Sequence, residues 1–232
     1  MPPHQAVLLD TLIPNANSGN ENRLHTVNEK FYKKIKRLGL QPKHVAEVGV
    51  YYPETSNILG FIEEGVRADL FEADPECVEK IGQRFAGYAN VTIHPYAIYH
   101  ERTTLGLYRA AASTFVQGVP SSPAMANDGY QPREQDLFHV EARLFSDFDD
   151  GTIDVLSIDV EGCEWYVLQH LVSRPMVISL EMGGKKRYIN PHAAEISDWM
   201  QRHGYVIWYK DKPDIIYIQK KYKPGFWARI TG

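Results

Sequence analysis

Short apolar runs recur along the chain at intervals that favour parallel β-strands alternating with helices. The four clearest runs are residues 45–48, 68–71, 153–159 and 176–181. They are short and mostly apolar, which is the pattern of strands buried on both faces of a parallel sheet. Helices are predicted at residues 27–38, 54–64, 75–87, 164–171 and 190–203. A third strand and the loop that leaves it are predicted at residues 91–98.

The pattern changes between residues 103 and 148. Residues 105–108 and 138–144 alternate between apolar and polar side chains, as half-buried strands do. Residues 117–136, between them, are rich in residues that break regular structure. Loops of this length inside a compact domain are uncommon and often carry function. We interpret residues 103–148 as a lid or substrate-binding insertion, with a merely mobile insertion as the alternative.

The two ends of the chain differ in pattern. Residues 1–22 end in a polar, breaker-rich cluster and are predicted to form an N-terminal arm. Residues 205–209 and 215–218 read as two strands joined by a tight connection, which predicts a hairpin. Residues 23–232 are therefore expected to form a single domain, because one α/β domain accommodates about 250 residues.

Composition narrows the class of protein. The chain has 232 residues, with 25 Lys and Arg against 29 Asp and Glu, a net charge of −4. A mildly acidic chain gives no electrostatic reason to expect nucleic-acid binding. Its two cysteines make neither a disulfide framework nor a zinc cluster. No segment has the roughly 18 apolar residues of a membrane span, and the first ten residues make a poor signal peptide. We expect a cytoplasmic protein without a membrane partner; a homodimer is compatible with the pattern.

Acidic side chains gather at the predicted carboxyl ends of strands. Glu47, Glu72, Asp159 and Glu181 all lie at or near such ends. Open α/β sheets bind ligands at this edge, and the acid after the second strand of a nucleotide-binding unit holds ribose hydroxyls. We therefore assign Glu72 to a ribose; the alternative is a surface acid stabilised by the following helix N-terminus.

Several motifs narrow the fold further. They are Val45-Ala46-Glu47-Val48-Gly49, Phe71-Glu72-Ala73-Asp74-Pro75, Ala112-Ser113-Thr114 and Asp159-Val160-Glu161-Gly162-Cys163-Glu164. In order and spacing the stretch 45–181 resembles the FkbM family of S-adenosyl-L-methionine-dependent methyltransferases. The resemblance implies the Rossmann-like class I methyltransferase fold, an α/β fold with a mostly parallel seven-stranded sheet, a C-terminal antiparallel hairpin and helices on both faces. The sequence departs from the family where Val50-Tyr51-Tyr52-Pro53 replaces a turn with a second glycine.

The resemblance implies S-adenosyl-L-methionine (SAM) as the cofactor. The residues assigned to binding it are Glu47, Gly49, Val50, Tyr51, Ser56, Glu72, Ala73, Asp74, Ala97 and Asp159. Asp74 could instead cap the following helix. Asp159, Glu161 and Glu181 are the catalytic candidates, because a carboxylate there could take the proton of an acceptor hydroxyl. The same three acids could hold Mg²⁺, whose preferred ligands are oxygens, but nothing in the sequence supports a metal.

Other assignments remain open. Glu164 is interpreted as an acid that stabilises a helix N-terminus. Residues 183–187 could be a basic turn that binds an acidic substrate or a solvated loop. We expect methylation of an oxygen on a small-molecule, sugar or natural-product acceptor, a preference that comes from the resemblance alone. Methylation of a peptide carboxylate or nitrogen shares every motif. A cofactor-binding domain without catalysis is a third hypothesis, and a nicotinamide oxidoreductase is the least favoured, because its pyrophosphate needs further glycines.

Overall fold

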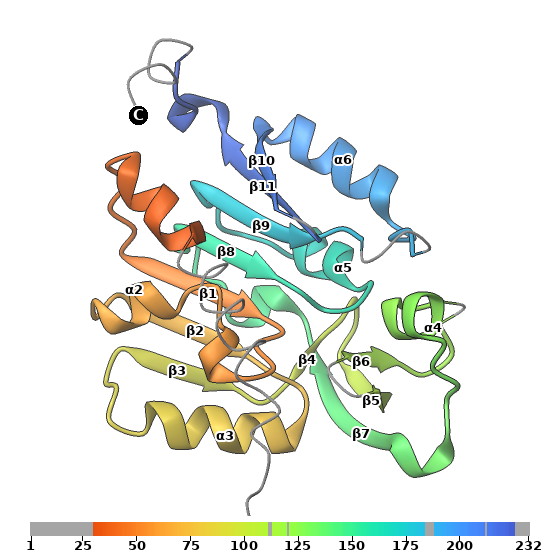
Figure 1. Ribbon diagram of the computed structural model, residues 1–232. Coiled ribbons are helices and arrows are strands. Elements are labelled where there is room, and N and C mark those ends of the chain that lie inside the picture. Colours follow the sequence, from red (N-terminus) through yellow and green to blue (C-terminus); the bar gives the residue numbers. More distant parts are fainter. Residues whose placement is uncertain (1–29, 111–112, 120, 184–187, 212, 226–232) are drawn as a thin grey trace, which may run out of the picture.

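The computed structural model describes residues 30–110, 113–119, 121–183, 188–211 and 213–225. A seven-stranded sheet lies at the centre, in the order β10-β11-β9-β8-β1-β2-β3 (Figure 1). Its strands are β1 (His44–Val48), β2 (Arg67–Phe71), β3 (Val91–His94), β8 (Val155–Ile158), β9 (Val177–Glu181), β10 (Tyr205–Asp211) and β11 (Asp214–Gln219). The predicted arm at residues 1–22 lies outside the described residues.

Strand direction in this sheet confirms the predicted fold class. β1 pairs in parallel with β2 and β8, and the parallel pairing continues to β3 on one side and β9 on the other. β11 runs antiparallel to β9 and to β10, so the C-terminal hairpin inserts one reversed strand. The carboxyl ends of the five parallel strands therefore meet at one edge, together with the beginning of β11.

Helices cover both faces of the sheet, because side chains along each strand alternate between two apolar cores. Val45 and Val155 face the helix at residues 30–37, α2 (Leu59–Glu63) and α3 (Pro75–Phe85). Ala46 and Leu156 face α5 (Glu164–Gln169) and α6 (Ala193–Arg202). All four of these side chains are fully buried. The predicted start of the first helix, at residue 27, lies outside the described residues.

The prediction of one continuous helix at residues 54–64 is wrong. The structure has a short 3-10 turn, η1 (Pro53–Thr55), followed by an extended residue, Ser56, whose ψ is 127°, and only then α2. The interruption has a local cause: the Ser56 hydroxyl and the Asn57 backbone N–H both donate hydrogen bonds to the buried carboxylate of Glu47. Satisfying a buried acid outweighs the helical preference of this segment.

Residues 97–143 contribute a second sheet rather than loops alone. Its order is β4-β7-β5-β6, formed by β4 (Ala97–Ile98), β5 (Thr103–Ala110), β6 (Ser113–Val116) and β7 (Leu137–Arg143). The predicted breaker-rich stretch 117–136 contains α4 (Pro123–Asp128) and the 3-10 turn η2 (Glu134–Asp136). In Figure 1 this sheet and α4 lie beside the carboxyl ends of the large sheet's strands. Further 3-10 turns follow at η3 (Phe145–Asp147) and η4 (Lys220–Tyr222).

Within the part of the chain that the structure describes, none of the helices has the length and apolar character needed to cross a bilayer.

Candidate active site

A cavity of about 750 Å³ opens at the carboxyl edge of the large sheet. Cavities of this size accommodate drug-sized ligands. Many of the sequence-predicted cofactor residues line it: Glu47, Gly49, Val50, Tyr51, Glu72, Ala73, Ala97 and Asp159. Glu161 lines the same cavity. Side chains from β1, β2, β8 and the second sheet therefore meet around a single space.

The turn after β1 brings bare backbone close to the cavity. Gly49 has a φ of +83°, and a Cβ atom added there would lie 1.8 Å from the carbonyl oxygen of Asp159. Tyr51 also has a positive φ, 59°, which is unusual for a residue with a side chain. Its ring packs on that of Tyr52, with ring centres 4.0 Å apart. Both tyrosines line the cavity without closing it.

The buried carboxylate of Glu47 holds the segment after β1 in place. It accepts hydrogen bonds from the Ser56 hydroxyl, at 2.5 Å, and from the Asn57 backbone N–H, at 2.9 Å. Burial raises the pKa of Glu47 to about 8. The charges of Asp159 and Asp214 also act to raise this pKa, whereas the two hydrogen bonds act to lower it. Ser56 is fully buried and is not among the residues lining the cavity. Its observed role is to hold Glu47.

Glu72 lies directly after β2 and ties the two halves of the turn together. One carboxylate oxygen accepts the backbone N–H groups of Val50 and Tyr51, at 3.1 and 2.7 Å. The other accepts the backbone N–H of Asp74, at 2.8 Å. Burial raises the pKa of Glu72, and these N–H groups oppose that rise. A carboxylate has about four acceptor sites, so it can still accept a ligand's hydroxyl.

The side chain of Asp74 contacts groups that do not line the cavity. It caps α3 by accepting the Glu76 backbone N–H, at 2.9 Å. It also binds the guanidinium of Arg109 through two bonds, of 2.5 and 2.6 Å. Asp74 is buried and is not among the residues lining the cavity. The helix cap considered in the sequence analysis is therefore observed, whereas a cofactor contact by Asp74 stays a prediction.

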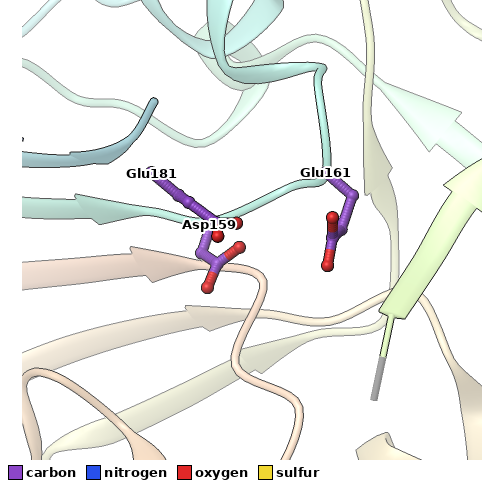
Figure 2. A group of neighbouring side chains, drawn as sticks. All are labelled: Asp159, Glu161 and Glu181. Atoms are coloured by element: carbon purple, nitrogen blue, oxygen red, sulfur yellow. The ribbon is translucent and has the colours of Figure 1, made fainter. Parts of the chain in front are cut away.

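The three catalytic candidates come together at the ends of β8 and β9. Each of Asp159, Glu161 and Glu181 offers an oxygen that lies within 4.8 Å of the oxygens offered by the other two. Figure 2 shows the carboxyl groups of Asp159 and Glu181 next to each other, with Glu161 approaching from the loop after β8. Burial, the Asp159 charge and a hydrogen bond between the two groups raise the pKa of Glu181. Burial also raises the pKa of Asp159, so both carboxyl groups of this pair have a raised pKa.

Glu161 is held in an unusual backbone conformation with a φ of 50°. One of its oxygens accepts the Ser113 hydroxyl, at 2.6 Å, and the other is buried without a partner among the described residues. Burial and the charge of Asp159 raise the pKa of Glu161 to about 8. Non-glycine residues with positive φ cluster at functional sites, where the surrounding structure maintains the strain.

Glu164 has the structural role that the sequence indicated. It accepts the backbone N–H groups of Val160 and Gly162, at 3.3 and 3.1 Å, in the turn before α5. It also accepts the side-chain amide of Asn190. Burial raises the pKa of Glu164 to about 7. These contacts fix the loop that carries Glu161.

Two residues at the site escaped the sequence analysis. Asp214 begins β11 and lines the cavity, and it pairs directly with Glu181 across the strands. Burial and the Asp159 charge raise the pKa of Asp214 to about 7. The reversed direction of β11 was the available signal, because an antiparallel strand starts where its parallel neighbours end. Ser113, the partner of Glu161, belongs to a recognised motif but had no assigned role. Residues 184–187 of the predicted basic turn lie outside the described residues.

A comparison with protein families shows to which family this chain belongs. The model of the methyltransferase FkbM domain matches residues 45–207. The chain belongs to the FkbM methyltransferase family. It is therefore a SAM-dependent methyltransferase, as the motifs implied. Curated protein sequences give no match to this chain.

Several solved structures are similar to this chain at low sequence identity. Magnesium protoporphyrin IX methyltransferase from Synechocystis PCC 6803, solved with bound SAM, is 10% identical, with a TM-score of 0.47 and coverage of 91% of this chain and 86% of that one. A candidate RNA methyltransferase from Pyrococcus horikoshii is 11% identical, with a TM-score of 0.46 and coverage of 83% of each chain. Ribosomal protein L11 methylase from Lactobacillus delbrueckii subsp. bulgaricus is 12% identical, with a TM-score of 0.42 and coverage of 87% and 78%. Their named acceptors differ, and nothing about the acceptor of this FkbM methyltransferase follows from them.

The residues of the cavity fit SAM. Gly49 lines the cavity, and its missing Cβ atom lets the turn after β1 pack against the backbone of Asp159, while Glu72 keeps about one free acceptor site beside it. Ala73 and Ala97 contribute small side chains to the cavity lining. The carboxylates suit a ligand that carries positive charge on both its ammonium and its sulfonium group.

Proposed function

We propose that this FkbM methyltransferase methylates an oxygen of a small-molecule, sugar or natural-product acceptor in the cavity at the carboxyl edge of the sheet. The observation that carries the proposal is that one cavity contains both the predicted ribose ligand, Glu72, and the predicted proton acceptors, Asp159 and Glu161. Donor and acceptor sites must be contiguous for a direct transfer, because the reacting atoms have to come within about 3–3.5 Å.

Glu72 and Gly49 would hold the donor. Glu72 is oriented by three backbone N–H groups, so its remaining acceptor site, one of about four, has a fixed direction before any ligand enters. Fixed acceptors bind hydroxyl groups without a further ordering cost. Glu47 supports the same turn from its buried position, and Tyr51 borders the cavity beside it. In this proposal, Ala97 leaves room for the adenine ring.

Asp159 and Glu161 would act on the acceptor. When bound, SAM supplies a methyl group on a cationic sulfur. The protein's contribution is to align the acceptor oxygen with that group and to remove the acceptor's proton. A base works best when its pKa is close to the working pH, and burial and the Asp159 charge raise the pKa of Glu161 to about 8. Glu161 is therefore the preferred proton acceptor, with the carboxyl groups of Asp159 and Glu181 beside it.

Binding is tested first. Thermal unfolding of the full chain with S-adenosylhomocysteine, against NAD as the comparison ligand, measures which cofactor the native state binds. A ligand at 100 times its Kd stabilises the native state by about 2.7 kcal/mol. We expect a shift with S-adenosylhomocysteine and none with NAD. Glu72→Gln and Glu72→Ala should lose most of the shift, whereas the exposed Glu79→Gln on α3 should keep it.

Turnover is tested second. Transfer of a radiolabelled methyl group from SAM into a library of hydroxylated small molecules measures the reaction. Asp159→Asn and Glu161→Gln should reduce transfer at least tenfold while retaining the S-adenosylhomocysteine shift. Normal binding by Glu72→Ala would refute the site assignment, and transfer into peptide acceptors alone would favour the second hypothesis. The cytoplasmic location and the homodimer stay predictions.

A further inference from the structure

The transfer end of the cavity combines acidic side chains with an apolar surface from the second sheet. Asp159, Glu161 and Asp214 come from the large sheet and its loops, whereas Thr114 and Phe115 come from β6. Cys163, a buried thiol, also borders this space. An acceptor that binds beside the methyl donor must therefore contact both the acidic side chains and the apolar surface.

The charge of the lining is one-sided. Five carboxyl groups line the cavity: Glu47, Glu72, Asp159, Glu161 and Asp214. No Lys, Arg or His belongs to the lining among the residues that the structure describes. Arg109, which lies close to Asp74, is already bound to Asp74 and Glu76. An anionic acceptor group placed beside Asp159, Glu161 and Asp214 would therefore lose its hydration without gaining a cationic partner from the described lining.

Glu161 shows where a hydrogen-bond donor is missing. Its first oxygen accepts the Ser113 hydroxyl, at 2.6 Å, which fixes the carboxyl group against β6. Its second oxygen is buried and has no partner within the described part of the chain. Buried acceptors are almost always paired in native proteins, so an exception requires an explanation. The backbone at Glu161, with a φ of 50°, holds the group in this position despite the strain.

The apolar surface is tied to the acidic one. Phe115 is buried, with its ring centre 5.8 Å from that of Tyr130, and it packs with Ala110 and Ala124. The strand that carries Phe115 is connected to the large sheet through the bond from Ser113 to Glu161. The preceding strand, β5, is connected to it through Arg109 and Asp74. The two surfaces are therefore held at a fixed separation.

We propose that this space binds an acceptor whose reacting group is a hydrogen-bond donor, a hydroxyl or an ammonium that gives a proton to Glu161 before the nitrogen is methylated, carried on an apolar body, and that it rejects phosphate and carboxylate groups. The hydroxyl or ammonium group donates a hydrogen bond to the second oxygen of Glu161, and the apolar body lies against Phe115. This inference rests on the proposed function, because it assigns the acceptor half of the same cavity. It opposes the interpretation in which residues 183–187 bind an acidic substrate.

Four probes with the same phenyl ring and different head groups test the proposal. They are benzyl alcohol, benzylamine, benzoate and benzyl phosphate, each titrated into the full chain saturated with S-adenosylhomocysteine and followed by ligand-observed NMR. We expect the alcohol and the amine to bind at least tenfold more tightly than either anion. Glu161→Gln should reduce the preference for the amine over benzoate at least threefold, and Glu161→Lys should reverse it. Glu141→Gln, an exposed acid on β7 outside the lining, should leave the ranking unchanged.

The outcomes separate this inference from the proposed function. The S-adenosylhomocysteine thermal shift is measured on every sample, so a variant that fails to fold is recognised by its loss. Absence of that shift in the unmodified chain would refute the proposed function. With a normal shift, any of three results would overturn this inference alone. They are tight binding of benzoate or benzyl phosphate, an unchanged ranking of the probes in both Glu161 variants, and no binding of any probe.

Discussion

Replacing Gly49 by alanine tests the geometry on which the site depends. A Cβ atom at this position would lie 1.8 Å from the carbonyl oxygen of Asp159 and 2.8 Å from its carbonyl carbon. Both atoms belong to the backbone, so no side-chain rotation can relieve the collision. The φ of Gly49, +83°, also lies in the region that residues with a Cβ atom avoid.

The expected cost combines two terms. A left-handed backbone costs a residue with a side chain about 1–2 kcal/mol, and forcing atoms into a packed site costs about 1–3 kcal/mol more. The sum, about 2–5 kcal/mol, is a large share of the 5–15 kcal/mol by which proteins are typically stable. For a chain of this size each kcal/mol lowers Tm by about 2–4 °C. We therefore expect Gly49→Ala to lower Tm by roughly 4–20 °C.

Urea unfolding without ligand measures the change, and two other glycines provide the controls. Gly65 has a similar φ, +82°, but open space where its Cβ atom would lie, so Gly65→Ala should show the conformational term alone. Gly82 lies inside α3 with open space around it, and Gly82→Ala should stabilise the chain by about 0.5–1 kcal/mol. If Gly49→Ala proves no less stable than Gly65→Ala, the close approach of β1 and β8 at the cavity does not exist as described.

Three further substitutions follow from the structure. Arg109→Lys loses the two-bond contact with Asp74 and, because this side chain is partly exposed, should cost only about 1 kcal/mol in urea unfolding; Arg202→Lys, in an exposed ion pair on α6, should cost less than half as much. Asp149→Ala leaves buried backbone N–H groups without their acceptor, and should lower the free energy of unfolding by about 3 kcal/mol. Burial acts to raise the pKa of Asp69, but hydrogen bonds from two histidines and their charges outweigh it and lower the pKa. A carboxyl group whose pKa is lower in the folded than in the unfolded protein stabilises the fold at a pH above the unfolded pKa, about 3.9 for Asp. This stabilisation is lost as the pH falls from that value toward the folded pKa. Unfolding curves from pH 6 to pH 2 should therefore show a smaller loss of stability on acidification for Asp69→Asn than for the parent chain; equal losses would contradict this.

The proposed acceptor pocket also bears on the role of the second sheet. The sequence analysis interpreted residues 103–148 as a lid or substrate-binding insertion, and this role stays a prediction. The structure adds that β5 and β6 contribute side chains to the cavity and that Arg109 and Ser113 connect them to the large sheet. A segment with such connections is better described as a wall of the site than as a freely moving cover.

The sequence by itself determined the order of strands and helices in the core. Apolar runs such as residues 45–48 form buried parallel strands because only a doubly covered sheet removes both faces from water. The acids after these strands then meet at one edge, since parallel strands end together. Glu72 and Asp159 could be placed in one site on that ground alone, together with the motifs that indicated the FkbM family.

Only the tertiary structure decided the rest, because it depends on partners that are distant in sequence. Glu47 interrupts the predicted helix by taking the donors of Ser56 and Asn57, and Asp214 joins the acids through an antiparallel pairing with Glu181. The oxygen of Glu161 that has no partner among the described residues is likewise a product of packing. Local propensity describes what each segment prefers, whereas a buried charge accepts whichever donors the fold brings within reach.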